Sequence, residues 1–188
     1  MIENLYKDVS NPNLLKSCET IVKFFDKSLS KMDLDDSKTR VMDPKELIED
    51  HQILKSEKLF EDCNLKLKSW MVFLQGPQRE QIIHAVGNSE TREGLSNWAL
   101  NIPLENYENS IMKWYGGKHL LKLITSKVDK RNYLEIDWKE DPYVIGTKHI
   151  TTPTIVNIEV PHRVTNFLNK TRKMLSVRFK TDESLLKT

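Results

Sequence analysis

The stretch RKMLSVRF, residues 172–179, alternates between two kinds of side chain. Successive side chains of an extended chain point to opposite faces, so this stretch predicts a β-strand with two different faces. The face that holds both arginines consists of Arg172, Met174, Ser176 and Arg178. The other face is mainly apolar and consists of Lys173, Leu175, Val177 and Phe179. An arginine inside a barrel needs an anion, and a carboxylate matches the two-pronged geometry of a guanidinium.

Short runs rich in β-branched and aromatic residues, separated by turn residues, fill the chain from about residue 65 to this strand. The runs are 65–74, 81–86, 96–104, 110–115, 119–125, 133–138, 143–150, 154–160 and 172–179. Prolines lie near the ends of several runs, where a missing N–H does least damage to the hydrogen bonding of a sheet. The pattern is typical of all-β sandwiches and barrels, and it supplies enough strands for a jelly roll.

The first 75 residues are built differently, since all six glycines of the chain lie after residue 75. Asn11 followed by Pro12 is a typical helix start, and apolar residues at helical spacing predict a helix over about residues 12–30. Residues 43–46 have the spacing of a capping box that opens a shorter helix, and the polar residues 31–40 predict a loop. We expect one domain over residues 1–188, with a helical N-terminal layer (1–64), a jelly-roll core (65–180) and a tail (181–188).

The chain has 188 residues, a mass of 22.0 kDa and a formal net charge of +2. Balanced charge gives no electric field that attracts nucleic acid or an anionic membrane surface, so neither partner is expected. No stretch approaches the ~20 apolar residues of a membrane span and no signal peptide is recognised, so we expect a cytoplasmic location. Cys18 and Cys63 are isolated in the sequence and predict reduced, mostly buried thiols.

Signatures of nucleotide-binding proteins, serine hydrolases and zinc proteases are missing from the sequence. Of the five histidines, two stand at the ends of predicted strands: His84, before a glycine and a polar loop, and His162, directly after Pro161. A polar turn over residues 166–170 separates His162 from the strand that begins at Arg172, so we expect a hairpin that directs both side chains into one cavity. Imidazoles at the mouth of a barrel are suitable iron ligands, and the absence of clustered cysteines excludes soft-ligand sites.

Together these residues resemble the iron(II)- and 2-oxoglutarate-dependent oxygenases, whose fold is the double-stranded β-helix, a jelly roll of cupin-like shape. The resemblance covers roughly residues 65–180. Members of this superfamily have a His-x-Asp/Glu pair on an early strand, a distal histidine late in the barrel, and an arginine shortly after it that binds the far carboxylate of 2-oxoglutarate. The resemblance implies that His84 and His162 bind Fe(II) and that Arg172 binds the cosubstrate.

Residues 98–115 also resemble the strands that follow the first ligand in small members of the superfamily, including the aspartyl/asparaginyl β-hydroxylase-like branch. Asn101 is a candidate cosubstrate contact, with a purely structural hydrogen bond as the alternative. Arg178 and Trp114 are candidate substrate contacts. The alternative for Arg178 is a surface ion pair, and the alternative for Trp114 is packing in the core. The polar loop of residues 88–97 is expected to act as a lid over a barrel mouth that the helical N-terminal portion also covers.

Val86 departs from the family pattern. Members of the family have an Asp or Glu two residues after the first histidine ligand, and this chain has a valine two residues after His84. Three interpretations stay open: iron held by two histidines and water, a halide in the vacant position as in related halogenases, or a barrel whose metal binding is weakened or lost. Glu90, Glu105 and Glu108 are possible substitutes, and their spacing does not select one of them. Without a carboxylate ligand, iron should be bound weakly and lost to chelators.

The sequence therefore predicts an oxygenase that uses Fe(II) and 2-oxoglutarate to hydroxylate an unidentified small molecule or peptide side chain. The histidines and Arg172 favour this function. Val86 favours an alternative, a non-catalytic cupin-like binding module that has lost metal-dependent activity. A third interpretation is a cupin isomerase, or a dioxygenase that does not use 2-oxoglutarate.

Overall fold

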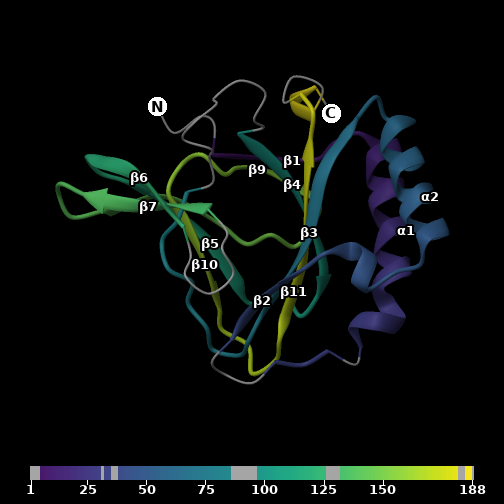
Figure 1. Ribbon diagram of the computed structural model, residues 1–188, viewed down its shortest axis with the longest axis horizontal. Coiled ribbons are helices and arrows are strands. Elements are labelled where there is room, and N and C mark those ends of the chain that lie inside the picture. The colour runs from purple at the N-terminus through teal and green to yellow at the C-terminus, as the bar shows by residue number, and fades with distance from the viewer. Residues whose placement is uncertain are drawn as a thin grey trace.

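The chain folds into two facing antiparallel sheets, a projecting two-stranded ribbon and a layer of helices (Figure 1). This computed structural model describes residues 5–30, 32–34, 38–85, 97–125, 132–181 and 185–187, with only the backbone for residues 121–125 and 132–135. Among the described elements, strands outnumber helices, and the two long α-helices lie in the N-terminal third of the chain. The predicted fold class, mainly β with a helical N-terminal layer, is confirmed.

Six strands form the larger sheet and three form the smaller one. The larger sheet has the order β1 (Tyr6–Asp8), β9 (Thr154–Asn157), β4 (Trp98–Glu105), β11 (Arg172–Phe179), β3 (Leu67–Gln75) and β2 (Thr39–Met42). The smaller sheet has the order β10 (His162–Asn166), β5 (Ser110–Gly116) and β8 (Tyr143–Lys148). The projecting ribbon consists of β6 (His119–Thr125) and β7 (Asn132–Trp138). All these strand pairs are antiparallel.

A buried apolar cluster fills the space between the two sheets. It includes Met112 and Trp114 from β5, Val164 from β10 and Met174 from β11. Because these strands come from both sheets and from distant parts of the sequence, burying their inward faces holds the sheets together. The jelly roll, or double-stranded β-helix, predicted from the short strands is therefore confirmed.

Two α-helices form close to the predicted start signals. Helix α1 (Pro12–Leu29) begins after Asn11, whose side chain accepts hydrogen bonds from two backbone N–H groups of the first turn. The capping box predicted at residues 43–46 opens only a 3₁₀ turn, η1 (Pro44–Glu46), and helix α2 (Asp50–Glu61) starts separately with a capping box of its own. In the described part of the chain, no helix combines the length and the apolar character needed to cross a membrane.

The helices pack against the outer face of the larger sheet, away from the smaller sheet (Figure 1). The apolar face of β11 supplies Leu175, Val177 and Phe179 to this helix-facing core, which also contains Phe25 of α1 and Phe60 of α2. Phe60 and Phe179 meet edge to face, with their ring centres 5.2 Å apart. The prediction that the helical portion covers the barrel mouth is wrong, because the apolar sides of the helices are buried on the outer face.

The N-terminal portion also contributes two strands that the sequence did not predict. Strand β1 pairs with β9, and β2 pairs with β3, so that each forms one edge of the larger sheet. The predicted loop, residues 31–40, runs into β2 at Thr39. An edge strand has a neighbour on one side only, and polar residues are common there, which explains why the pattern was not recognised. The predicted tail also joins the fold, since Leu185 is fully buried in the helix-facing core.

Two predicted features near the histidines differ in the structure. Within residues 81–85 there is no continuous strand, and isolated bridges connect this region to β10 at Glu80 and His84. The predicted hairpin between the strands of His162 and Arg172 is absent, because β10 pairs with β5 in the smaller sheet and β11 pairs with β3 and β4 in the larger one. His162 and Arg172 therefore belong to facing sheets.

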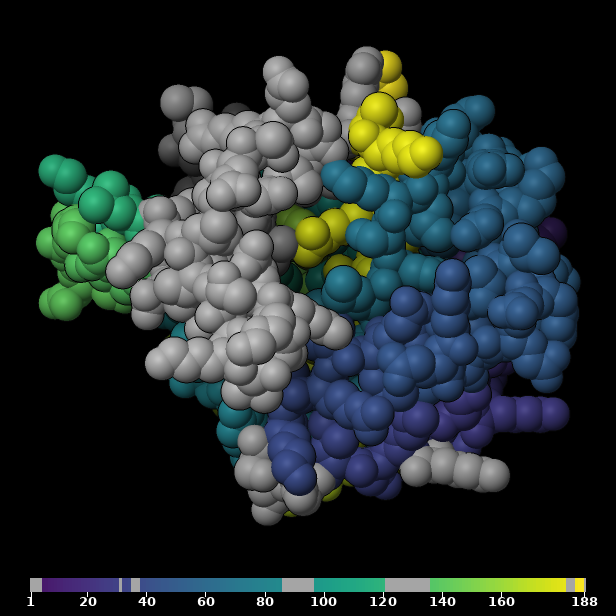
Figure 2. Space-filling view, in the orientation of Figure 1, coloured from purple at the N-terminus to yellow at the C-terminus, as the bar shows by residue number. Residues whose placement is uncertain are grey.

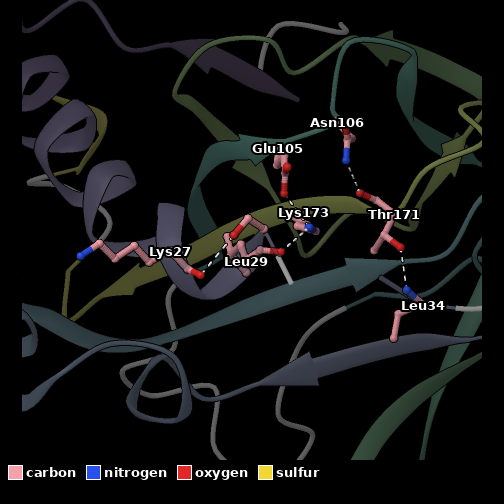
Figure 3. A network of polar contacts seen from close by, with 8 residues as sticks. Lys27, Leu29, Leu34, Glu105, Asn106, Thr171 and Lys173 are labelled. Carbon is pink, nitrogen blue, oxygen red and sulfur yellow. Dashed lines mark hydrogen bonds and ion pairs between the residues drawn. The ribbon is translucent and has the colours of Figure 1, made fainter. Parts of the chain in front are cut away.

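Lys173 joins the helical layer to the larger sheet (Figure 3). Its side chain is almost fully buried, and its Nζ donates to the carbonyl oxygen of Leu29, the last residue of α1, at 2.6 Å. The same Nζ forms an ion pair with Oε2 of Glu105 on β4 at 2.5 Å. A cation at a helix C-terminus is stabilised by the negative end of the helix dipole. The charge of Lys173 is thus balanced by groups of the chain itself.

Replacing Lys173 with alanine should lower the free energy of unfolding by about 2–3 kcal/mol, because the Leu29 carbonyl and the half-exposed Glu105 carboxylate lose their cation. Urea unfolding followed by circular dichroism measures this change. Lys180→Ala, at an exposed lysine directly after β11, is the matched control and should change stability by less than ~0.5 kcal/mol. Equal effects of the two substitutions would show that Lys173 does not join the layers.

Candidate functional site

A cavity lies between the two sheets, against the face of β11 that carries the arginines. Its free volume is about 60 Å³. The space-filling view shows a hollow near the centre of the visible side of the molecule, where yellow atoms of the C-terminal segment can be seen (Figure 2). Its wall includes His84, Asn101, His162, Arg172 and Arg178, all singled out from the sequence. The rest of the described wall carries no charge and consists of Phe73, Gln81, Met112, Ile158, Val164, Met174 and Ser176.

Arg172 and His162 lie toward opposite ends of this cavity. Nε of Arg172 donates to Oγ of Ser110 at 3.0 Å. Ser110 on β5 is paired with Asn166, the last residue of β10, whereas His162 is the first residue of β10. Val164 forms the wall between the two ends. A ligand that placed a carboxylate at Arg172 would therefore extend along the barrel toward the imidazole of His162.

His84 and His162, the first residue of β10, lie opposite each other in an isolated antiparallel β-bridge. The backbone N–H of each donates to the carbonyl of the other, at 2.9 and 2.8 Å, and the ring centres are 4.5 Å apart. In both residues Nδ1 contacts the carbonyl oxygen two residues earlier, at 3.0 Å for Ile82 and 2.8 Å for Val160. A carbonyl oxygen only accepts, so Nδ1 carries the proton and Nε2 keeps its lone pair. Both rings are thus in the tautomer that binds metal through Nε2.

Burial keeps both imidazoles neutral. Loss of hydration is the main cause that lowers the pKa of His162 from 6.5 to about 3, and the nearby His84 and Arg178 act in the same direction. Burial also lowers the pKa of His84, although this residue keeps part of its surface in solvent. A neutral imidazole is the form that binds a metal ion.

The imidazole pair fits a metal ion as two of its ligands. Metal–nitrogen bonds of about 2.1 Å that meet at roughly a right angle place two imidazole ring centres about 4–5 Å apart. The observed separation of 4.5 Å lies in this range. Among the described residues, no group of three or more His, Cys, Asp or Glu side chains could hold a metal ion. Glu105 pairs with Lys173 away from the cavity and Glu108 is exposed, so neither replaces the missing carboxylate.

Arg172 is a buried cation whose described side-chain partner is neutral. It is 3% exposed, and the hydroxyl of Ser110 accepts its Nε–H. Burial lowers the pKa of Arg172 to about 10, so the guanidinium is still charged at neutral pH. A buried charge without a counter-ion is costly, and a carboxylate bound in the cavity would offset this cost through two parallel hydrogen bonds. Asn101 adds a buried Oδ1 that has no hydrogen-bond partner among the described residues and can accept from a ligand or water.

Trp114 does not line the cavity, so its predicted contact with substrate is corrected to packing. The side chain is fully buried in the cluster between the sheets. Its Nε1 donates to the carbonyl of Asn157 at 2.9 Å, and its ring stacks on Tyr6 with ring centres 5.6 Å apart. Because the ring and the N–H are both engaged, little of this side chain is left for a ligand.

Ser110, whose hydroxyl accepts a hydrogen bond from Arg172, was not predicted from the sequence as a site residue. The signal was present, because Ser110 lies at even spacing before the inward-facing Met112 and therefore points into the barrel. Three predictions concern residues outside those that the structure describes: the missing carboxylate at Val86, the substitute ligand Glu90 and, apart from Asn97, the lid over residues 88–97.

No protein family model and no curated protein matches the chain. Several solved structures resemble its backbone. A prolyl-4-hydroxylase from Pseudomonas putida is 10% identical, with a TM-score of 0.43 over 95% of this chain and 93% of that one. The prolyl hydroxylase of Trichoplax adhaerens, in complex with a hypoxia inducible factor oxygen degradation domain peptide fragment, is 12% identical, with a TM-score of 0.45 over 99% and 88%. Oxalate decarboxylase from Bacillus subtilis is 11% identical, with a TM-score of 0.35 over 82% of this chain and 29% of that one.

These similarities concern the fold alone. At such identities and at TM-scores below 0.5 they assign no residue and no activity to this chain. The chemistry of the cavity therefore has to be argued from its own side chains.

The metal-free protein should lose stability as the pH falls from 7 to 5. His162 binds a proton near pH 6.5 in the unfolded chain but only near pH 3 in the folded chain, so the unfolded state gains the proton first. The contribution is fully present above pH 6.5, and linkage gives a loss of about 2 kcal/mol at pH 5. Urea unfolding at both pH values measures it. His162→Asn, which can still donate to the Val160 carbonyl, should remove most of the loss, whereas the exposed control His149→Asn should keep it.

Proposed function

We propose that this chain is an iron(II)- and 2-oxoglutarate-dependent oxygenase. One observation carries the proposal: a single cavity holds two neutral imidazoles whose Nε2 atoms keep their lone pairs toward one end and the buried guanidinium of Arg172 at the other. Neutral nitrogen ligands suit iron(II), and a charged guanidinium suits a carboxylate. A small dicarboxylate that chelates the metal and reaches a buried arginine meets both requirements, and 2-oxoglutarate is such a molecule.

Each residue has a separate task in this proposal. His84 and His162 hold the iron through Nε2, with their rings oriented by the hydrogen bonds of Nδ1. Arg172, positioned by Ser110, binds the far carboxylate of 2-oxoglutarate in a site from which bulk water is excluded, which strengthens the pairing. Asn101 accepts a hydrogen bond from bound water or ligand. Iron(II) bound here supplies oxidation of the substrate by O₂, coupled to decarboxylation of 2-oxoglutarate.

One observation favours a second function, a non-catalytic binding module of cupin-like shape. No carboxylate of the described residues lines the cavity, and Val86 cannot provide one at the position where the family has it. Such a module would use Arg172 to bind a small carboxylate without any metal. The two functions differ in whether iron(II) changes the affinity for 2-oxoglutarate.

Several finer statements stay predictions from the sequence. A small molecule or a peptide side chain is the predicted substrate, and the Trichoplax adhaerens hydroxylase is bound to a peptide fragment. The cytoplasmic location and the absence of nucleic-acid and membrane partners likewise stay predictions.

Anaerobic titration with iron(II) and 2-oxoglutarate tests the oxygenase. The wild type should develop the weak visible charge-transfer absorption of the chelate, and calorimetry should give tighter 2-oxoglutarate binding with iron(II) than without it. His162→Ala should abolish the absorption. Arg172→Gln should weaken 2-oxoglutarate binding by roughly 100-fold, because a charge-assisted carboxylate pairing is lost. Arg163→Gln is the matched control. Arg163 follows His162 on β10, so its side chain points away from the cavity, and it pairs with Glu80 at 2.9 Å.

The outcomes separate the two functions. Binding of 2-oxoglutarate that depends on Arg172 but not on iron(II) would replace the oxygenase by the binding module. No binding at all in the wild type would contradict both functions. Equal affinities of Arg172→Gln and Arg163→Gln would remove Arg172 from the cosubstrate site.

A further inference from the structure

Arg178 is a second guanidinium in the cavity, and binding of iron and cosubstrate does not use it. It lies on the same face of β11 as Arg172 and also lines the cavity. Unlike Arg172, it keeps part of its surface in solvent, so it belongs to the accessible end of the cavity. It lies six residues after Arg172 on β11, and its side chain lines the same cavity as the imidazole of His162.

No carboxylate of the described residues balances the charge of Arg178. The described wall of the cavity contains no acidic residue, and the ion pairs among the described residues do not involve the two cavity arginines. By contrast, Arg163 outside the cavity has Glu80 and Lys173 on the other face of β11 has Glu105. Two positive charges in a partly enclosed cavity, whose described wall is otherwise neutral, attract anions, because water screens them poorly there.

The two arginines are too far apart to serve the same end of one small ligand. Six residues at about 3.3 Å each put their α-carbons roughly 20 Å apart along β11. Arg172 is held at Ser110, whereas Arg178 lies near the other end of this face of β11. A cosubstrate bound between Arg172 and the imidazoles therefore leaves Arg178 for a different molecule, which enters from the accessible end.

We propose that Arg178 binds a carboxylate of the substrate, so that the substrate of this protein is a small carboxylic acid. The inference rests on the proposed function, because that function makes the second molecule a substrate. A guanidinium binds a carboxylate with two parallel hydrogen bonds and so fixes its orientation as well as its position. Pairing with Arg178 would hold the rest of the acid beside the imidazoles, where oxidation takes place.

Matched probes that differ only in charge test this assignment. The probes are the N-acetyl derivatives of glycine, alanine, valine and leucine, each compared with its neutral amide. Their affinities are measured by ligand-observed NMR on the full chain with saturating 2-oxoglutarate and no iron, so that no turnover occurs. In the wild type at least one acid should bind about 10-fold more tightly than its amide, as expected for a charge-assisted pairing. Arg178→Gln should remove this preference, and Arg178→Lys should retain part of it.

Controls separate this inference from the proposed function. Arg163→Gln should keep the preference for acids, and Arg178→Gln should keep the 2-oxoglutarate affinity of the wild type within about threefold, a difference of less than 1 kcal/mol. A wild type that prefers no acid over its amide, or a preference that survives in Arg178→Gln, would overturn the assignment. Loss of 2-oxoglutarate binding in Arg178→Gln would also overturn it. If the wild type does not bind 2-oxoglutarate, the oxygenase fails, while an acid preference abolished by Arg178→Gln would still support the anion site.

Discussion

The alternation of side chains along β11 is the constraint on which the rest of the structure depends. This strand is hydrogen-bonded to β3 on one side and β4 on the other, and both of its faces are covered. One face completes the core with the helices, and the other forms a wall of the cavity. A shift of register by one residue would turn Arg172 toward the helices and Leu175 toward the cavity. The helix-facing core and the candidate site therefore both require the same register of β11 with its neighbouring strands.

Two neighbouring cations on this strand differ in how their charge is balanced. Lys173 is buried against the last carbonyl of α1 and the carboxylate of Glu105, so its charge is satisfied within the chain. Arg172 is equally buried, but a neutral hydroxyl is its described side-chain partner. Since the two side chains point to opposite faces, the strand holds one charge within the helix-facing core and presents the other to the cavity.

Much of the fold could be predicted from local sequence patterns. The cap at Asn11 predicted α1, and the alternation of residues 172–179 predicted β11 with the bounds that the structure has. Strand pairing was harder to predict, because it depends on contacts far apart in sequence. The hairpin between His162 and Arg172 was wrong for this reason: a short turn usually joins paired strands, but here it leads from one sheet to the other. Their side chains still share a cavity because the two sheets face each other.

The hydrogen bonds that tie His84 and His162 to their own backbones make the ligand geometry independent of metal. Each ring is held by a carbonyl two residues earlier, so its rotation is restricted before any ion arrives. Small metal-binding domains that fold only around their ion unfold when the ion is removed. In this protein, two buried apolar clusters surround the site and form without any metal. Under the proposed function, we therefore expect iron to bind and dissociate reversibly while the metal-free protein stays folded.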